Sequence, residues 1–106
     1  MSDLGVMAIR FEDDADAELI DAGQYYAERS PKAAADFAAA VEAALVQVQQ
    51  MPWSAPAWPG RPDLRRRVLA KFPYAIVYMV VEPTEIIVVA VEHVKRRPGY
   101  WLGRVR

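Results

Sequence analysis

The sequence predicts a single α+β domain in the order β-α-α-β-β-β, with an antiparallel sheet packed against an α-helical hairpin. The 106 residues are 54% hydrophobic and 25% charged, a composition typical of one folded domain. Two segments with helical periodicity meet at Ser30-Pro31, and two long runs rich in valine and isoleucine follow later in the chain. We therefore expect residues 1–106 to form one domain, without an internal repeat.

The N-terminal part predicts a short strand followed by a helix. Val6–Phe11 is β-branched in part and ends at an acidic segment. Asp13 or Asp14 is suited to cap the helix, because acidic side chains stabilise a helix N-terminus. We expect the acidic residues of Glu12–Asp21 to lie on the solvated side of this helix. Its apolar stripe consists of Ala15, Leu19, Ala22 and Tyr26.

A second helix is predicted from Ser30-Pro31 to about Gln50, because serine is a preferred N-cap and proline suits the first turn. The two helices should form an antiparallel hairpin. Met51–Pro62 then holds four of the eight prolines, so neither a helix nor a central strand can run through it. We expect Trp53 and Trp58 to pin this irregular segment onto the core.

Three strands are predicted next, at Leu64–Lys71, Pro73–Val81 and Glu85–Glu92. The last two lack the polar alternation of a sheet with one wet face, so both faces of the sheet need cover. The helical hairpin can cover one face, and Val94–Arg106 or a partner must cover the other. The expected core includes Phe37, Val41, Leu45, Ile76, Tyr78, Ile87 and Val89.

The charge is unevenly distributed along the chain. Residues 1–50 carry ten acidic and three basic side chains, whereas residues 51–106 carry ten basic and four acidic ones. The two halves can attract each other within the fold, or the basic half can attract a phosphate backbone or an acidic protein segment. With no cysteine and one histidine, we expect no metal site and no cofactor. No membrane span or signal peptide is indicated, which favours a cytoplasmic location.

Two segments carry a resemblance to a known family. They are Phe72-Pro73-Tyr74-Ala75-Ile76-Val77-Tyr78 and the stretch from His93 to Arg104, which contains Arg96-Arg97-Pro98-Gly99-Tyr100-Trp101. Together with Tyr25-Tyr26, Phe37 and the proline-rich segment, they resemble the RelE/ParE superfamily of bacterial toxins. The resemblance covers almost the whole chain.

The resemblance implies the toxin of a type II toxin–antitoxin module, also called a plasmid stabilisation protein. Such a toxin is held inactive in a hetero-oligomer with a cognate antitoxin and meets operator DNA only through that antitoxin. ParE-like members inhibit DNA gyrase, whereas RelE-like members cleave mRNA on the ribosome. The resemblance therefore leaves open whether the chain is an enzyme. A non-toxic relative that only binds an antitoxin is a third possibility.

Metal-independent RNA cleavage needs a base, an acid and cations that hold the phosphate. If the chain is RelE-like, the candidates are His93 and Tyr100 for proton transfer and Arg65, Arg67 and Arg97 for the phosphate. Each has a structural alternative: a hydrogen-bonded histidine, solvated arginines and an aromatic that covers the sheet. The candidates for partner binding are Arg65, Arg67, Arg96 and Trp101. RelE-like nucleases tend to carry several lysines and arginines across the sheet, whereas this chain has only Lys32, Lys71 and Lys95. Its Phe72-Pro73-Tyr74 run, long hairpin and Gly99-Tyr100-Trp101 tail also resemble the ParE-like members, so the ParE-like alternative is favoured.

Overall fold

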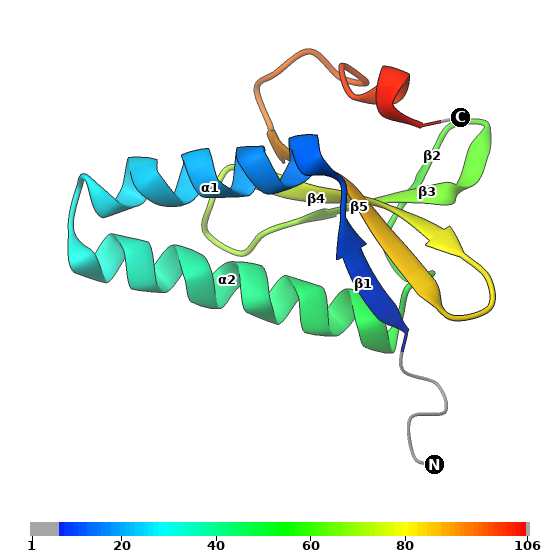
Figure 1. Cartoon of the computed structure of the whole chain (residues 1–106), viewed down its shortest axis with the longest axis horizontal. Helices are drawn as coiled ribbons and strands as arrows, with labels where there is room; N and C mark the ends of the chain where they lie inside the picture. The colour runs from blue at the N-terminus through cyan, green and yellow to red at the C-terminus, as the bar shows by residue number, and fades with distance from the viewer. Residues whose placement is uncertain (1–6, 106) are drawn as a thin grey trace.

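The computed structural model describes residues 7–105 and shows a helical hairpin lying across a five-stranded sheet (Figure 1). The elements are β1 (Ala8–Phe11), α1 (Asp13–Ala27), α2 (Pro31–Gln50), β2 (Ala57–Trp58), β3 (Arg61–Val68), β4 (Tyr74–Val81), β5 (Glu85–His93) and the 3-10 helix η1 (Leu102–Arg104). The predicted α+β class and element order are confirmed, with the two-residue strand β2 as an addition. Val6, the predicted start of the first strand, lies outside the described residues. No helix in residues 7–105 has the length and apolar character that a membrane crossing requires.

The sheet has the order β1-β5-β4-β3-β2 and is mixed, not wholly antiparallel as the sequence suggested. The pairs β2–β3, β3–β4 and β4–β5 are antiparallel, but β1 pairs in parallel with β5, with Ala8 opposite Glu85. A parallel pair needs a long crossover connection, and everything between β1 and β5, including both helices, supplies it. β5 therefore lies between β1 and β4.

The two helices begin differently. Ser30 caps α2 as predicted: its Oγ accepts a hydrogen bond from the Ala33 amide at 2.9 Å, and Pro31 is the first helical residue. α1 is preceded by Glu12, not capped by Asp13 or Asp14, and Glu12 makes no side-chain cap bond. The carboxylates in its first turn still face the positive end of the helix dipole.

The helix face of the sheet holds the larger core cluster, which we define by Phe37, Val41, Val48, Ile76, Tyr78, Ile86 and Val88 together with Ala15 and Ala22 of α1. The expected core residues are confirmed as buried with one exception. Leu45 is only partly buried, because it lies on the side of α2 that faces α1 across an open groove.

The opposite face, which we call the tail face, is covered by the chain's own C-terminal segment. Trp101 is fully buried there against Leu64, Val77, Val89 and Ala90. The ring of Trp58 meets that of Trp101 edge-on, with 4.9 Å between the centroids. The expected role of Trp58 is thus confirmed, whereas Trp53 is 45% exposed and does not pin its loop by burial.

Candidate functional site

Arg65, one of the residues proposed for RNA cleavage, lies apart from His93. Arg65 pairs with Tyr78 on β4, which pairs with Val88 on β5, five residues before His93. At about 3.3 Å per residue along a strand and about 4.8 Å between strands, the Cα atoms of Arg65 and His93 are about 19 Å apart. One base and one phosphate clamp at this separation cannot act on the same phosphodiester.

His93 already has a structural partner. Its Nδ1 accepts a hydrogen bond from the Lys95 amide at 3.1 Å, and its ring meets that of Tyr74 edge-on at 5.0 Å. It lies at the end of β5, as the sequence suggested. His93, Arg96 and Tyr100 do line one shallow depression of about 190 Å³, which Glu18 and Asp21 also border.

Arg65 and Arg67 project from the same side of β3, as their spacing predicts, but both are used within the chain. Arg65 donates to the carbonyl oxygens of Trp53 at 2.7 Å and Ala55 at 2.9 Å. Arg67 donates to Gln47 Oε1 at 3.1 Å and to Ser54 Oγ at 2.8 Å. These bonds fasten the segment after α2 to β3, so neither arginine is a free surface charge.

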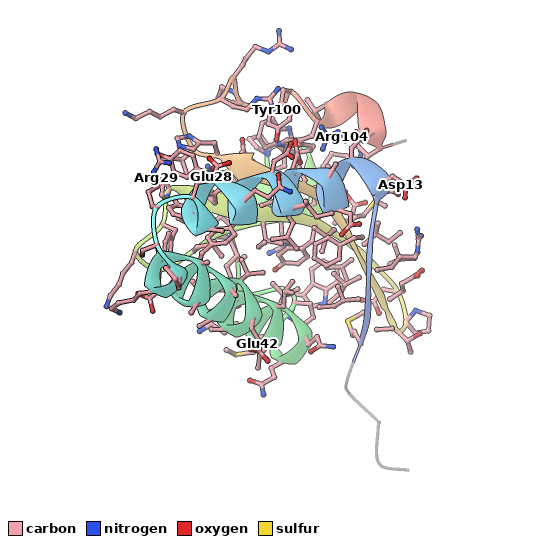
Figure 2. All side chains as sticks on the ribbon, turned by 60° about the vertical axis from the view of Figure 1, so that its left-hand side comes forward. Asp13, Glu28, Arg29, Glu42, Tyr100 and Arg104 are labelled. Carbon is pink, nitrogen blue, oxygen red and sulfur yellow. The ribbon has the colours of Figure 1, made fainter. Side chains whose placement is uncertain are left out.

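The C-terminal segment is held by a polar cluster centred on Glu18 (Figure 2 shows Tyr100 and Arg104 beside α1). Arg104 donates to both carboxylate oxygens, at 3.0 and 3.1 Å, and the Tyr100 hydroxyl donates to Oε2 at 2.6 Å. The Val91 amide donates to Oε1 at 2.9 Å. The Arg96 guanidinium lies 3.8 Å from Oε2 and 3.7 Å from the centre of the Tyr100 ring.

The expectation that the acidic residues of α1 are solvated is wrong for Glu18, whose side chain is 16% exposed. Glu18 lies on the same stripe as Ala15, Leu19 and Ala22, and a carboxylate on a buried stripe needs partners. The helical spacing of Glu18 from Ala15 and Ala22 was the feature of the sequence that indicated its burial. The cluster also shows that part of the charge asymmetry is satisfied within the fold, since Glu18 and Asp14 face Arg104.

The pKa values of Glu18, Tyr100 and Arg104 are shifted in this cluster, and the bond to Glu18 raises that of Arg104. Burial alone would raise the pKa of Glu18, but the bonds from Arg104, Tyr100 and the Val91 amide outweigh it and lower the pKa. Burial, together with the bond to Glu18, raises the pKa of Tyr100 far above its usual range. A tyrosine with so high a pKa holds its proton at neutral pH and is a poor general acid.

The remaining candidates lie in the C-terminal segment. Arg96 and Arg97 are exposed in the loop after β5. Trp101 has no exposed surface, so no partner can touch it unless the segment leaves the sheet. Among residues 7–105, no three histidine or acidic side chains come together as a metal site would require.

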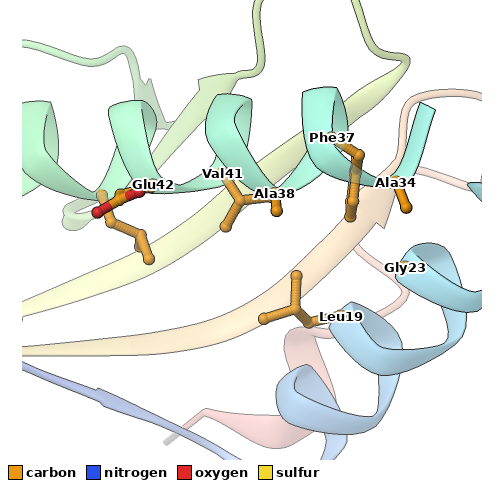
Figure 3. Close-up of a pocket in the computed structure, with 8 residues that line it drawn as sticks. Leu19, Gly23, Ala34, Phe37, Ala38, Val41 and Glu42 are labelled. Atoms are coloured by element: carbon orange, nitrogen blue, oxygen red, sulfur yellow. The ribbon is translucent and has the colours of Figure 1, made fainter. Parts of the chain in front are cut away.

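An apolar groove between α1 and α2 was not predicted. Its volume is about 390 Å³, and Figure 3 shows Leu19 and Phe37 on opposite sides of it, with the carboxylate of Glu42 at one end. Gly23 leaves space on the α1 side, since it carries no side chain. The groove is lined by Leu19, Gly23, Ala34, Phe37, Ala38, Val41, Glu42 and Leu45. The glycine and the alanines at helical spacing were the only signal in the sequence.

The comparisons with known proteins agree with this architecture. A solved structure described as a chromosomal ParDE TA system from P. aeruginosa matches with a TM-score of 0.68 and 19% identity, over 86% of this chain and 99% of that chain. At this identity the match shows the fold alone. No curated relative matches the sequence.

The class of protein follows from the match to a family model. The model describes the ParE toxin of type II toxin–antitoxin systems, parDE, and it matches residues 9–98. The chain belongs to the ParE toxin family.

Proposed function

We propose that this chain inhibits DNA gyrase and is neutralised by a cognate antitoxin, in the cytoplasm and within a hetero-oligomer. Membership of the ParE toxin family supports the proposal. The observation that carries it is that the nuclease candidates His93, Arg65 and Tyr100 are each engaged in a structural hydrogen bond, and that Arg65 lies apart from His93. An inhibitor that acts by binding does not need an assembled group of acid, base and phosphate-binding side chains.

The alternative is ribosome-dependent cleavage of mRNA by a RelE-like site. One observation favours it: His93, Arg96 and Tyr100 border the same depression. Against it, the Tyr100 hydroxyl is bound to Glu18, and its pKa is raised, first by burial. A third alternative is a non-toxic relative that only binds an antitoxin.

Supercoiling by purified gyrase, measured with and without the toxin, separates these alternatives. We expect the unmodified protein and His93→Ala to inhibit gyrase equally and to leave mRNA on ribosomes intact. Cleavage on ribosomes that His93→Ala abolishes would establish the RelE-like alternative. A protein inactive in both assays would support the binding-only relative.

The groove between α1 and α2 is the surface we assign to the antitoxin. The sequence left open whether the C-terminal segment or a partner covers the second face of the sheet, and the C-terminal segment covers it. The groove is an open apolar surface on the helical hairpin, and its apolar lining between two helices suits an amphipathic helix.

A charged side chain in the groove should prevent neutralisation. We expect Ala38→Arg to keep gyrase inhibition and to lose rescue by the antitoxin, because the guanidinium would meet the apolar lining. Ala43→Arg is the matched control, since Ala43 is exposed on the same helix and does not line the groove. Rescue of both variants alike would place the antitoxin elsewhere.

A further inference from the structure

Several cations at one end of the molecule have no carboxylate partner in the part of the chain that the structure describes. Other arginines are paired with carboxylates: Arg10, Arg61, Arg66, Arg96 and Arg104 contact Glu85, Asp63, Glu92 or Glu18. Arg65 and Arg67 are held by neutral acceptors. The unpaired cations at this end are Arg29, Lys71, Lys95 and Arg97, all exposed. Together with the exposed Arg96 we call them the basic end.

Three segments distant in sequence meet to form the basic end. The Val94 amide donates to the Pro73 carbonyl at 2.9 Å, which places the loop after β5 beside the β3–β4 connection that carries Lys71. The Tyr26 ring lies 5.0 Å from the Phe72 ring and joins the end of α1 to the same connection. Figure 2 shows Arg29 at that end of α1, on the side from which the loop leading to Tyr100 leaves the sheet.

The positive charge of this end is not cancelled by its surroundings. The carboxylates of the same region are Glu18, Asp21, Glu28 and Asp36, fewer than the five cations, and Asp36 is paired with a further cation, Lys32. The charge of Glu18 is already balanced by its bidentate hydrogen bonds from Arg104. A chain with a net charge of −1 can bind a polyanion only where its cations are concentrated, and here they are.

The aromatic side chains of the basic end are covered by arginines. The Arg29 guanidinium lies 3.6 Å from the centre of the Tyr25 ring, and Arg96 covers Tyr100 at 3.7 Å. Single-stranded nucleic acids are held mainly by bases that stack on open aromatic faces. An arginine covers one face of each of these rings, and Tyr25 remains 46% exposed. Cations rather than free ring faces therefore dominate this surface, which suits a duplex, whose bases stay stacked inside it.

We propose that the basic end binds the phosphate backbone of duplex DNA without sequence preference. Lys95 and Arg97 supply the principal contacts, because both are exposed in a loop and neither forms an ion pair within residues 7–105. The choice of DNA over duplex RNA rests on the proposed gyrase target, whose substrate is duplex DNA. The contact itself is a property of this chain alone and needs no gyrase.

The test is the binding of a fluorescent duplex of about 20 base pairs, followed by anisotropy from about 50 to 200 mM salt. We expect the affinity of Lys95→Glu/Arg97→Glu to fall at least ~10-fold at low salt, with a salt slope smaller by about 2. Arg10→Glu/Arg61→Glu is the control, since it changes the net charge equally at other places on the sheet. Circular dichroism verifies that each variant is folded.

Four outcomes would overturn the proposal. The unmodified protein could bind without salt dependence, or the control could weaken binding as much as the loop variant. Polyglutamate could compete as well as DNA at equal charge, which would assign the basic end to an acidic protein segment. Tighter binding of an RNA duplex would overturn the choice of DNA. Because no gyrase is present, none of these results bears on gyrase inhibition.

Discussion

At the scale of single residues, one carboxylate joins three segments of the chain. Glu18 connects α1 to β5 through the Val91 amide and to the C-terminal segment through Tyr100 and Arg104. Charge-assisted hydrogen bonds of this kind are stronger than neutral ones. The carboxylate is largely buried, so each bond that it accepts also compensates for its lost hydration.

We expect Glu18→Gln to lower the free energy of unfolding by about 1–3 kcal/mol at pH 7, because an amide cannot match the charge of Arg104. The measurement is urea unfolding followed by circular dichroism. Asp14→Asn is the control: Asp14 is 72% exposed and faces Arg104 at 3.5 Å, so its loss should cost much less. Equal effects of the two changes would contradict the central place of Glu18.

The same carboxylate predicts a dependence of stability on pH. Its pKa is lower in the folded chain than the ordinary value of 4.5, so the unfolded chain takes up a proton first as the pH falls. The stabilisation is fully present above about pH 4.5 and is lost as the pH falls through the lowered pKa. Unfolding of Glu18→Gln between about pH 3 and 6 should therefore show a shallower pH dependence than the unmodified protein.

At the scale of elements, the sequence predicted the start of α2 and the antiparallel pairing of the later strands, but neither the cap of α1 nor the parallel pairing of β1. The start of α2 was predictable because Ser30 and Pro31 act on their own helix. The parallel pairing of β1 was not, since it joins residues more than seventy positions apart and depends on where β5 lies. The candidate site shows the same contrast between local features and distant contacts. The sequence identified Arg65 as a candidate, but its carbonyl partners belong to a loop whose path the sequence does not reveal.

The turn before η1 depends on one glycine. Gly99 has a φ of +79°, and a Cβ there would lie 3.0 Å from Leu102 Cδ1 and 3.2 Å from Trp58 Cζ2. We expect Gly99→Ala to cost about 1–3 kcal/mol of stability, because the left-handed conformation disfavours alanine and the space is occupied. Gly103→Ala is the matched control, with nothing within 4 Å of its Cβ. Thermal unfolding of both variants measures the difference, and equal midpoints would contradict the packing described.

At the scale of the whole molecule, the sheet separates two hydrophobic cores that are covered by very different amounts of structure. The helix face is covered by two full helices, whereas the tail face depends on Trp101 and its neighbours Trp58 and Tyr100. The need for cover on both faces was predictable from the apolar strands. Which segment supplies it was left open between the tail and a partner, because periodicity alone cannot tell a chain's own segment from another protein.

We expect Trp101→Ala to cost about 3–5 kcal/mol, since it removes the largest side chain of the tail face. Trp101→Phe should cost much less, because the ring of phenylalanine still fills most of the site. The indole N–H of Trp101 also has no acceptor within the described residues, so its removal leaves no partner unsatisfied. Urea unfolding of both variants measures the difference; similar costs would show that the apolar cover is not what stabilises this face.

The position of β5 has a consequence for how the chain is made. The ribosome delivers β1 and both helices well before β5, the strand that β1 pairs with and on which α1 packs. Contacts so distant in sequence form slowly, because the intervening chain must first be ordered. During that interval the apolar stripes of the nascent hairpin have no sheet to cover them. The time spent in this incomplete state, and its tendency to aggregate, should be set by the arrival of one strand.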